Sequence, residues 1–116
     1  MDKTEDVIIR LDFDRGDITF AACKFMVAES EDGPKLRATD SAFTFHEDIV
    51  NSMRAEGIEG KVLGGGMLNI CPQKKEIRAC SLSINYGMAP CDVVEKLLND
   101  YCAKIGYKAI VRMGER

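Results

Sequence analysis

Residues 76–113 have the sequence EIRACSLSINYGMAPCDVVEKLLNDYCAKIGYKAIVRM. The β-favourable residues at 76–86 and 107–113 predict two strands, and apolar residues three and four apart between them predict a helix. The apolar stripe of this helix consists of Val94, Leu97, Leu98, Tyr101, Cys102 and Ile105. Two strands joined through a helix in this way lie parallel, and the crossover is right-handed.

The ends of this helix are marked by residue type. It begins near residues 90–92, where Asp92 and Glu95 have the spacing of a capping pair. Gly106 follows the last apolar position and predicts a left-handed residue that ends the helix.

Two further strand segments lie near the start of the chain. Residues 7–13 and residues 18–28 are rich in β-favourable side chains, and the Asp-Arg-Gly-Asp sequence at 14–17 is a turn signal. We expect the two strands to form a hairpin or to lie side by side. Residues 29–35 are polar and favour a loop, and residues 36–38 favour a short third strand.

The sequence from residue 44 predicts a second helix. Thr44 and Glu47 have the spacing of a capping box, so Thr44 is the expected N-cap and His46 falls in the second helical position. The apolar side of this helix consists of Phe45, Ile49, Val50 and Met53. Gly57 supplies the left-handed residue that ends it.

The triplet Gly64-Gly65-Gly66 stands before a predicted strand at 67–71 and a predicted turn at 72–75, which pairs that strand with residues 76–86. The segments together give about six strands and two helices. They indicate an α/β fold of the α+β type, with a mixed sheet flanked by two helices. We expect a single domain over residues 1–116.

The composition is that of one ordinary globular domain. The chain has 116 residues, of which 46% are hydrophobic and 30% are charged. Its net charge is -3 and its longest basic run is Lys74-Lys75, which argues against nucleic acid as a partner. The apolar stretches are about ten residues or fewer, whereas roughly 20 are needed to cross a bilayer. The chain opens with MDKTED and no apolar leader, so we expect a cytoplasmic protein. We also expect it to act as a monomer.

The cysteine and histidine counts restrict the chemistry. The five cysteines are odd in number and at least nine residues apart, which fits neither a disulfide framework nor a zinc site. We expect reduced and mostly buried thiols at Cys23, Cys71, Cys80, Cys91 and Cys102. His46 is the single histidine, so a site with two histidines cannot be built within one chain. We expect no metal and no other cofactor.

The predicted position of His46 suits chemistry on an anion. In the first turn of a helix four backbone amides lack partners, so an anion can bind there beside the imidazole. The same positive field favours the neutral ring, which suits a general base or a nucleophile. A solvated or locally hydrogen-bonded histidine is the structural alternative.

Two other segments have residues suited to binding phosphate. The glycines at 64–66 permit positive φ and close backbone approach, although a bend or bulge in the sheet explains them equally. Ser83 and Asn85 follow at the carboxyl end of a strand that leads into the crossover helix, where open α/β sheets bind ligands. Strand alternation places both on one face and Ile84 on the other, and edge residues explain them equally.

Three segments in order are Phe45-His46-Glu47-Asp48-Ile49, Leu63-Gly64-Gly65-Gly66 and Ser83-Ile84-Asn85-Tyr86-Gly87. In combination they resemble the janus/ocnus family, and the similarity runs from Leu11 to Tyr107. The resemblance implies a sheet of about six strands flanked by two helices. It also implies metal-independent hydrolysis of phosphohistidine, or of phospholysine, on proteins or small phosphoramidates.

The resemblance assigns roles to individual residues. It implies His46 as the catalytic residue and the backbone at Ser83, Ile84 and Asn85 as the phosphate-binding segment. Because phosphoryl transfer depends mostly on positioning and on charge stabilisation, amides and one or two cations suffice for a labile P–N bond.

The chain departs from the family pattern where positive charge is expected. The family lysine of the second strand falls near Ala21, with Lys24 as the nearest replacement. Arg37 matches a family arginine after a one-residue shift, Asn85 replaces a small alanine, and Met67 stands where arginine commonly follows the glycines. From the resemblance we expect a phosphohistidine phosphatase-like enzyme, although the missing cations weaken its affinity for phosphate. The alternative is a catalytically impaired module that binds a phosphorylated or acidic ligand or a protein partner.

Overall fold

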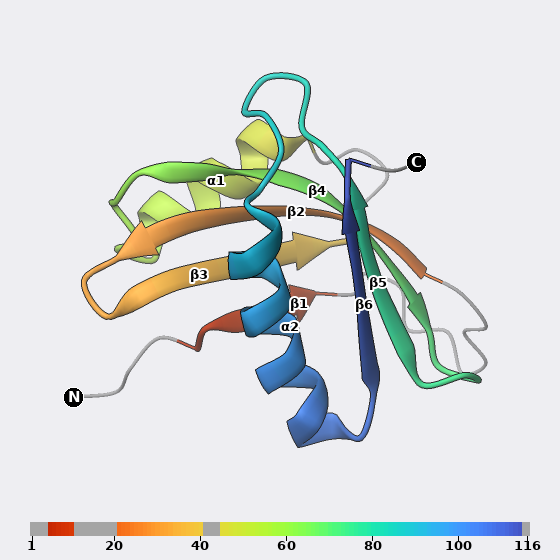
Figure 1. Cartoon of the computed structure of the whole chain (residues 1–116). Helices are drawn as coiled ribbons and strands as arrows, with labels where there is room; N and C mark the ends of the chain where they lie inside the picture. The colour runs from red at the N-terminus through yellow and green to blue at the C-terminus, as the bar shows by residue number, and fades with distance from the viewer. Residues whose placement is uncertain (1–4, 11–20, 41–44, 115–116) are drawn as a thin grey trace.

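The strand, helix, strand unit forms one end of the sheet. The structure, a computed structural model, describes residues 5–10, 21–40 and 45–114. Strands β5 (Glu76–Ser81) and β6 (Lys108–Met113) pair in parallel, and α2 (Cys91–Ile105) connects them (Figure 1). The predicted parallel pair with a helical connection is confirmed.

The bounds of this unit differ from the prediction at two points. Strand β5 ends at Ser81, where a positive φ of 65° turns the chain out of the ladder, so the predicted strand to residue 86 is too long. Helix α2 begins at Cys91, within the predicted range of 90–92, but its N-cap is Pro90 rather than Asp92 and has no side-chain capping bond. Gly106 ends α2 with a φ of 75°, as predicted.

The first three strands have a different order from the prediction. Strands β1 (Val7–Arg10), β2 (Ala21–Ser30) and β3 (Gly33–Thr39) belong to a sheet with the order β1-β3-β2-β4-β5-β6. The expected adjacency of the first two strands is wrong, because β2 and β3 form a hairpin through residues 31–32 and β3 takes the place beside β1. The predicted turn at 14–17 lies outside the described residues.

The glycine triplet lies inside a continuous strand. Strand β4 (Val62–Cys71) runs through residues 64–66 and pairs with β2 on one side and with β5 on the other. The pairing register shifts between Val27 and Ala28, which marks a β-bulge beside the triplet. The glycines therefore lie at a bulge in the sheet, which is one of the two explanations that the sequence allows. The turn at 72–75 is as predicted.

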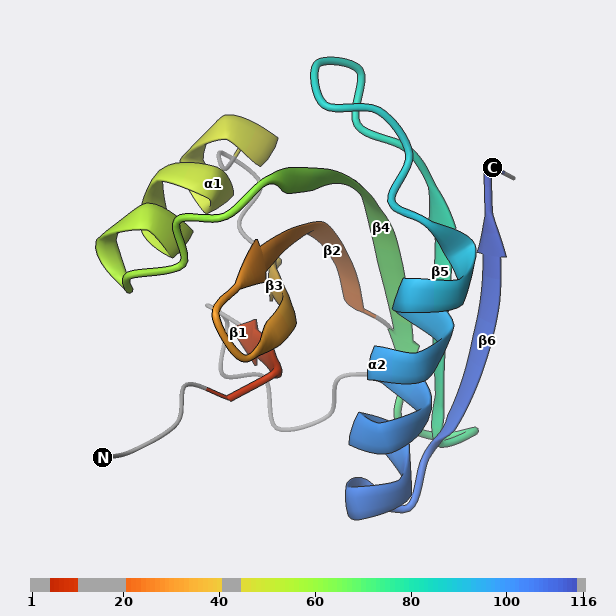
Figure 2. The same ribbon diagram turned by 60° about the vertical axis from the view of Figure 1, so that its left-hand side comes forward.

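Helices α1 (His46–Ala55) and α2 cover opposite faces of the twisted sheet (Figure 2). Buried on the α2 face are Phe25, Val27, Leu68, Ile77, Ala79, Val94, Leu98 and Cys102. Buried on the α1 face are Met26, Ala28, Ile49, Val50, Met53 and Ile58. The mixed sheet of six strands with two helices confirms the predicted fold class. Neither helix in the described part of the chain is long and apolar enough to span a membrane.

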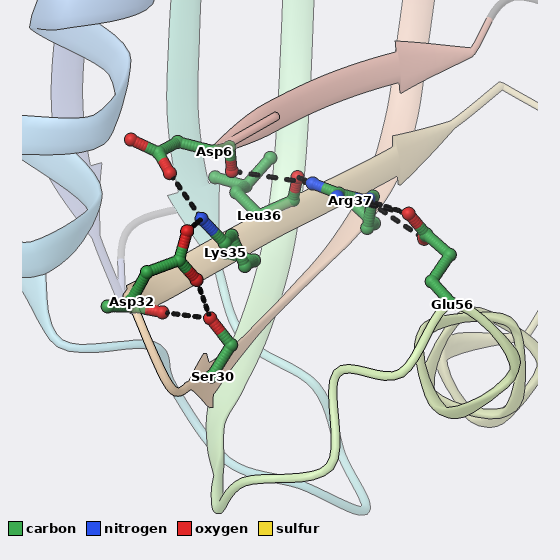
Figure 3. Close-up of polar contacts among 8 residues, drawn as sticks. Asp6, Ser30, Asp32, Lys35, Leu36, Arg37 and Glu56 are labelled. Atoms are coloured by element: carbon green, nitrogen blue, oxygen red, sulfur yellow. Dashed lines mark hydrogen bonds and ion pairs between the residues drawn. The ribbon is translucent and has the colours of Figure 1, made fainter. Parts of the chain in front are cut away.

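Lys35 is a buried charge within residues 29–35, the segment predicted as a polar loop. Its ammonium lies 2.6 Å from Asp6 Oδ1 and 3.1 Å from Asp32 Oδ2 (Figure 3). Asp32 also accepts a hydrogen bond from Ser30 Oγ at 2.7 Å. The lysine side chain is 1% exposed. The network therefore ties the chain at the start of β1 to the tip of the β2–β3 hairpin.

The network makes the stability of the protein depend on pH in a definite direction. Burial alone would lower the pKa of Lys35, but the hydrogen bonds and charges of Asp6 and Asp32 outweigh burial and raise it. This contribution is present below the unfolded pKa of about 10.4 and is lost as the pH rises through the folded value. Hydrogen bonds from Ser30 and Lys35 lower the pKa of Asp32. That contribution is present above about pH 3.9 and is lost as the pH falls through the lowered value.

Replacing Lys35 by methionine tests this network. We expect Lys35→Met to lower the free energy of unfolding at pH 7 by about 1–2 kcal/mol, since charged hydrogen bonds are lost but two exposed carboxylates remain hydrated. We also expect the loss of stability below pH 4 to be shallower than in the wild type, because Asp32 loses one cause of its lowered pKa. Urea unfolding between pH 7 and pH 2 measures both, with Lys96→Met at an exposed position as control. An acid dependence equal to that of the wild type would contradict the assignment.

Candidate functional site

The first turn of α1 positions the single histidine. The helix begins at His46, its N-cap is Phe45, and Asp48 Oδ2 accepts a hydrogen bond from the Phe45 amide at 2.9 Å. The predicted N-cap, Thr44, lies outside the described residues. Asp48 rather than Glu47 caps the helix because it stands three residues after the N-cap. His46 is therefore the first helical residue, one position earlier than predicted.

The imidazole of His46 packs against the glycine triplet in β4. Its Nε2 lies 3.1 Å from the carbonyl oxygen of Gly66. Because a carbonyl oxygen can only accept, Nε2 carries the hydrogen, and in the neutral ring the lone pair is on Nδ1. A Cβ atom on Gly65 would lie 3.0 Å from His46 Cδ2, so the glycine leaves the space that the ring needs. Nδ1 is thus the ring atom that can accept a proton or attack an electrophile.

The segment after β5 is a closed turn rather than an extension of the strand. The amide of Ser83 donates to the carbonyl of Gly87 at 3.1 Å, and the Gly87 amide donates back to Ser83 at 2.8 Å. Ser83 Oγ, buried in the turn, accepts from the Tyr86 amide at 3.2 Å. The prediction that Ser83 and Asn85 share a face is wrong: Ser83 is buried, and Asn85 is exposed as is Ile84.

This turn is attached to the same strand that receives the histidine. The Gly65 amide donates to the Gly87 carbonyl at 3.0 Å, and the Ala89 amide donates to the Gly65 carbonyl at 3.1 Å. A Cβ on Gly64 would lie 2.6 Å from the carbonyl carbon of Met88, so a side chain there would separate the turn from β4. The imidazole and the turn therefore meet on consecutive glycines.

Two amides of the turn can bind an anion. Ile84 N and Asn85 N find no acceptor among the residues that the structure describes, whereas the next amide is bonded to Ser83. Successive unbonded amides favour an oxyanion such as phosphate. Two apolar side chains border the site, Ile84 at 95% exposed and Phe45 at 69% exposed. Such exposed apolar groups favour contact with a macromolecule.

The site motifs coincide with a family match. A model of the Janus/Ocnus family matches residues 6–106. The chain belongs to the Janus/Ocnus family. The match includes the histidine, the glycine triplet and the turn after β5, so all three motifs of the resemblance lie within it. No curated protein matches the chain.

This Janus/Ocnus protein places Lys24 beside the histidine. Lys24 in β2 pairs directly with Met67 in β4, the residue after Gly66. Its ammonium lies 5.7 Å from the centre of the Phe45 ring, next to His46 in the chain. The lysine predicted for the phosphate site is therefore near the histidine and on the same side of the sheet.

Arg37 has a different position. Its Nε lies 2.9 Å from Glu56 Oε2, and its Nη1 donates to the Leu36 carbonyl at 2.9 Å (Figure 3). Glu56 follows His46 by ten residues, which is about 15 Å along a helix, so the guanidinium lies toward the opposite end of α1. Arg37 lines a cleft of about 260 Å³ between β1, β3 and α1, and the lining does not include His46. The structure does not bring Arg37 to the predicted phosphate site.

The buried cysteines are not reactive thiolates. All five are free thiols, as predicted. Burial raises the pKa of Cys23 to about 12 and also raises the pKa of Cys102, so both remain protonated at neutral pH. The prediction that most thiols are buried is wrong, since Cys71 and Cys80 are half-buried and Cys91 is exposed.

Two contacts of the site are not evident from the sequence. The carbonyl of Gly87 holds the Gly65 amide, and Phe45 serves as the helix cap although its side chain has no acceptor. The signal for the first is the glycine itself, whose φ of 82° lets the chain return to β4. The second has no local signal, because the bond to Asp48 comes from the backbone of Phe45.

Proposed function

We propose that this protein is a phosphohistidine phosphatase, which hydrolyses the P–N bond of phosphohistidine on proteins without a metal ion. The observation that carries the proposal is that His46 contacts the glycine triplet to which the turn at 83–87 is also hydrogen-bonded. One nitrogen of the ring is held by the Gly66 carbonyl, and the other has its lone pair. Unbonded amides and the ammonium of Lys24 lie on the neighbouring segments. The family resemblance supports the same reaction, with phospholysine and small phosphoramidates as further substrates.

The chemistry needs a lone pair and positive partial charge. The amides of Ile84 and Asn85, with Lys24, stabilise the phosphoryl oxygens. Nδ1 of His46 either takes a proton from an attacking water or attacks phosphorus itself, with water then cleaving the phosphorylated imidazole. In both routes an O–P bond replaces the P–N bond, and the released nitrogen of the substrate takes a proton. The carboxylate of Asp48 accepts the hydrogen bond of the Phe45 amide at the start of α1 and offsets the positive partial charge there. We therefore assign phosphate binding to the turn and to Lys24.

The surroundings of the site favour a protein substrate and a reducing compartment. Phe45 and Ile84 are exposed beside the site and can pack against the chain that carries the phosphorylated residue. Free thiols at all five cysteines fit the cytosol. All groups of the proposed site come from one chain, so a monomer can act alone.

The test is phosphate release from a histidine-phosphorylated peptide, with the same peptide carrying phosphoserine as control. We expect release from the phosphohistidine peptide in the presence of a metal chelator, and none from the phosphoserine peptide, because a P–O bond lacks a leaving group that a proton readily expels. Release equal to that without protein would overturn the proposed activity.

One observation favours a second candidate function, a module that binds a phosphorylated ligand without hydrolysis. Met67 is half-buried on the same face as Lys24, where the family commonly has arginine. A site with one cation fewer stabilises the transferring phosphoryl group less. Binding of a phosphorylated peptide without release of phosphate would select this candidate.

Restoring the cation tests the role of position 67. We expect Met67→Arg to lower the KM for a phosphohistidine peptide about 5-fold, because a unit charge some 4–6 Å from a phosphate contributes about 1 kcal/mol in a partly solvated site. Steady-state kinetics and inhibition by inorganic phosphate measure the change. Met67→Gln has a similar length without charge, and equal effects of the two substitutions would contradict the charge argument.

A further inference from the structure

On the face of the sheet that α1 occupies, no helix of the described residues packs on β4, β5 and β6 beside the candidate site. Helix α1 packs on β2 and β3, and both views place it away from β5 and β6 (Figures 1 and 2). On the other face of β4, β5 and β6 the residues Leu68, Ala79 and Val111 pack in the core with α2. The alternate residues of these strands therefore point away from α2.

The pairing register arranges these alternate residues in rows across the strands. One row consists of Lys24, Met67, Cys80 and Arg112. The next row consists of Ala22, Asn69, Arg78 and Ile110, and a third of Cys71, Glu76 and Lys108. We name the surface formed by these three rows the basic face.

The charge of the basic face is opposite to that of the whole chain. Its cations are Lys24, Arg78, Lys108 and Arg112, and its acid is Glu76, which gives a net charge of +3 (four minus one) against -3 for the chain. Arg78 is 60% exposed and pairs with Glu76 only at 3.7 Å. Arg112 and Lys108 are exposed, and no carboxylate of the described residues lies within ion-pair distance of either. The side chains of Lys108 and Arg112, and the exposed guanidinium of Arg78, are therefore available to an anionic ligand.

The basic face adjoins the histidine. The row of Met67 and Arg112 follows Gly66, whose carbonyl receives the hydrogen bond of His46. Met67 and Arg112 are separated by two strand spacings, about 10 Å. An extended peptide advances about 3.3–3.6 Å per residue, so a chain that leaves the histidine along this row reaches Arg112 after about three residues.

We propose that the basic face binds an acidic segment of the substrate protein, with Asp or Glu side chains three to five residues from the phosphorylated histidine. Arg112 and Arg78 are the residues that select it, and the proposal rests on the proposed function of His46. A peptide fits this surface better than a nucleic acid does. The cations are few, their spacing follows the separation of the strands and not that of phosphates along a nucleic acid, and the whole chain has a net charge of -3.

The first experiment compares two phosphohistidine peptides that differ only in having Glu or Gln at the flanking positions. We expect the wild type to prefer the Glu peptide about 10-fold in kcat/KM. The double variant Arg78→Gln/Arg112→Gln should lose this preference and retain its rate on the Gln peptide. The double variant Lys96→Gln/Lys104→Gln removes the same charge from α2, on the opposite side of the sheet, and should keep the preference. Equal rates of the wild type on both peptides would overturn the inference.

The second experiment is independent of catalysis. Fluorescence anisotropy of the unphosphorylated Glu peptide with His46→Ala should show binding that weakens with added salt and is lost in Arg78→Gln/Arg112→Gln. If the protein binds the Glu peptide through Arg78 and Arg112 but the wild type releases no phosphate, the phosphatase function is contradicted and the docking surface is not. If the wild type releases phosphate but neither experiment shows a preference for Glu over Gln, the docking surface alone is contradicted. An oligonucleotide of equal charge that displaces the peptide at lower concentration would overturn the choice of a peptide.

Discussion

His46→Ala is expected to reduce the release of phosphate from a phosphohistidine peptide by about 1000-fold. The substitution removes both ring nitrogens, and positioned proton transfer or nucleophilic attack contributes factors of about 100 to 10,000 to enzymatic rates. His46 is the single histidine, so no second imidazole of the chain can replace it. Phosphate release under saturating peptide, followed for the wild type and the variant at equal concentration, measures the loss.

His46→Gln is the matched variant for this experiment. The glutamine amide can still donate to the Gly66 carbonyl, as Nε2 does, but it provides no basic lone pair. We therefore expect a loss of activity similar to that of His46→Ala, with a free energy of unfolding within about 1 kcal/mol of the wild type. Retention of more than a tenth of the wild-type rate by the glutamine variant would show that the imidazole is not the reactive group.

Gly65→Ala is expected to destabilise the protein by about 3 kcal/mol and to remove most of the proposed activity. A Cβ at this position would lie 2.6 Å from the Phe25 carbonyl oxygen and 2.5 Å from Met26 Sδ. The thioether can move, but the carbonyl oxygen belongs to the neighbouring strand and moves only if the β2–β4 pairing is disturbed. The same Cβ would press on the His46 ring at Cδ2. Urea unfolding and phosphate release measure the two effects.

Asn69→Ala is the control for the glycine substitution. Asn69 lies four residues further along β4, is half-buried, and its replacement by alanine removes atoms instead of adding one. We expect a loss of stability below about 1 kcal/mol, because the contact of its amide with Cys80 Sγ is long, at 3.8 Å. If Gly65→Ala were as stable and as active as Asn69→Ala, the close packing at the triplet would not be needed.

The parts of the fold that the sequence predicts are those with local signals. The β5–α2–β6 unit follows from apolar periodicity and from Gly106, and both act within a few residues. The order of β1, β2 and β3 is not local. Nothing in residues 7–13 specifies that β3 rather than β2 lies beside them, and the deciding contacts, such as the bond from the Leu36 amide to the Asp6 carbonyl, join distant residues.

The sequence predicts some of the residues that the structure brings together at the candidate site, but not the geometry of the site and not the position of Arg37. His46 and the glycine triplet meet as the motifs suggest, because a helix start and a strand each have a clear pattern. The sequence predicts a strand through Ser83 because alternating polar and apolar residues suit both a strand and a closed turn, and only the hydrogen bonds between Ser83 and Gly87 distinguish the two. The position of Arg37 depends on its ion pair with Glu56 at the end of α1, and the sequence does not indicate that this end of the helix packs beside β3.

The attachment of the turn to β4 has a consequence for dynamics. The Gly65 and Gly87 bond joins the turn to a central strand, so the turn cannot open without disturbing pairing near the core. Its amides are thus ordered before any ligand binds. The conformational entropy of this turn is lost when the protein folds, so binding does not lose it again. A ligand at this turn meets a rigid receptor, and its association should depend on charge and diffusion rather than on the closing of a lid.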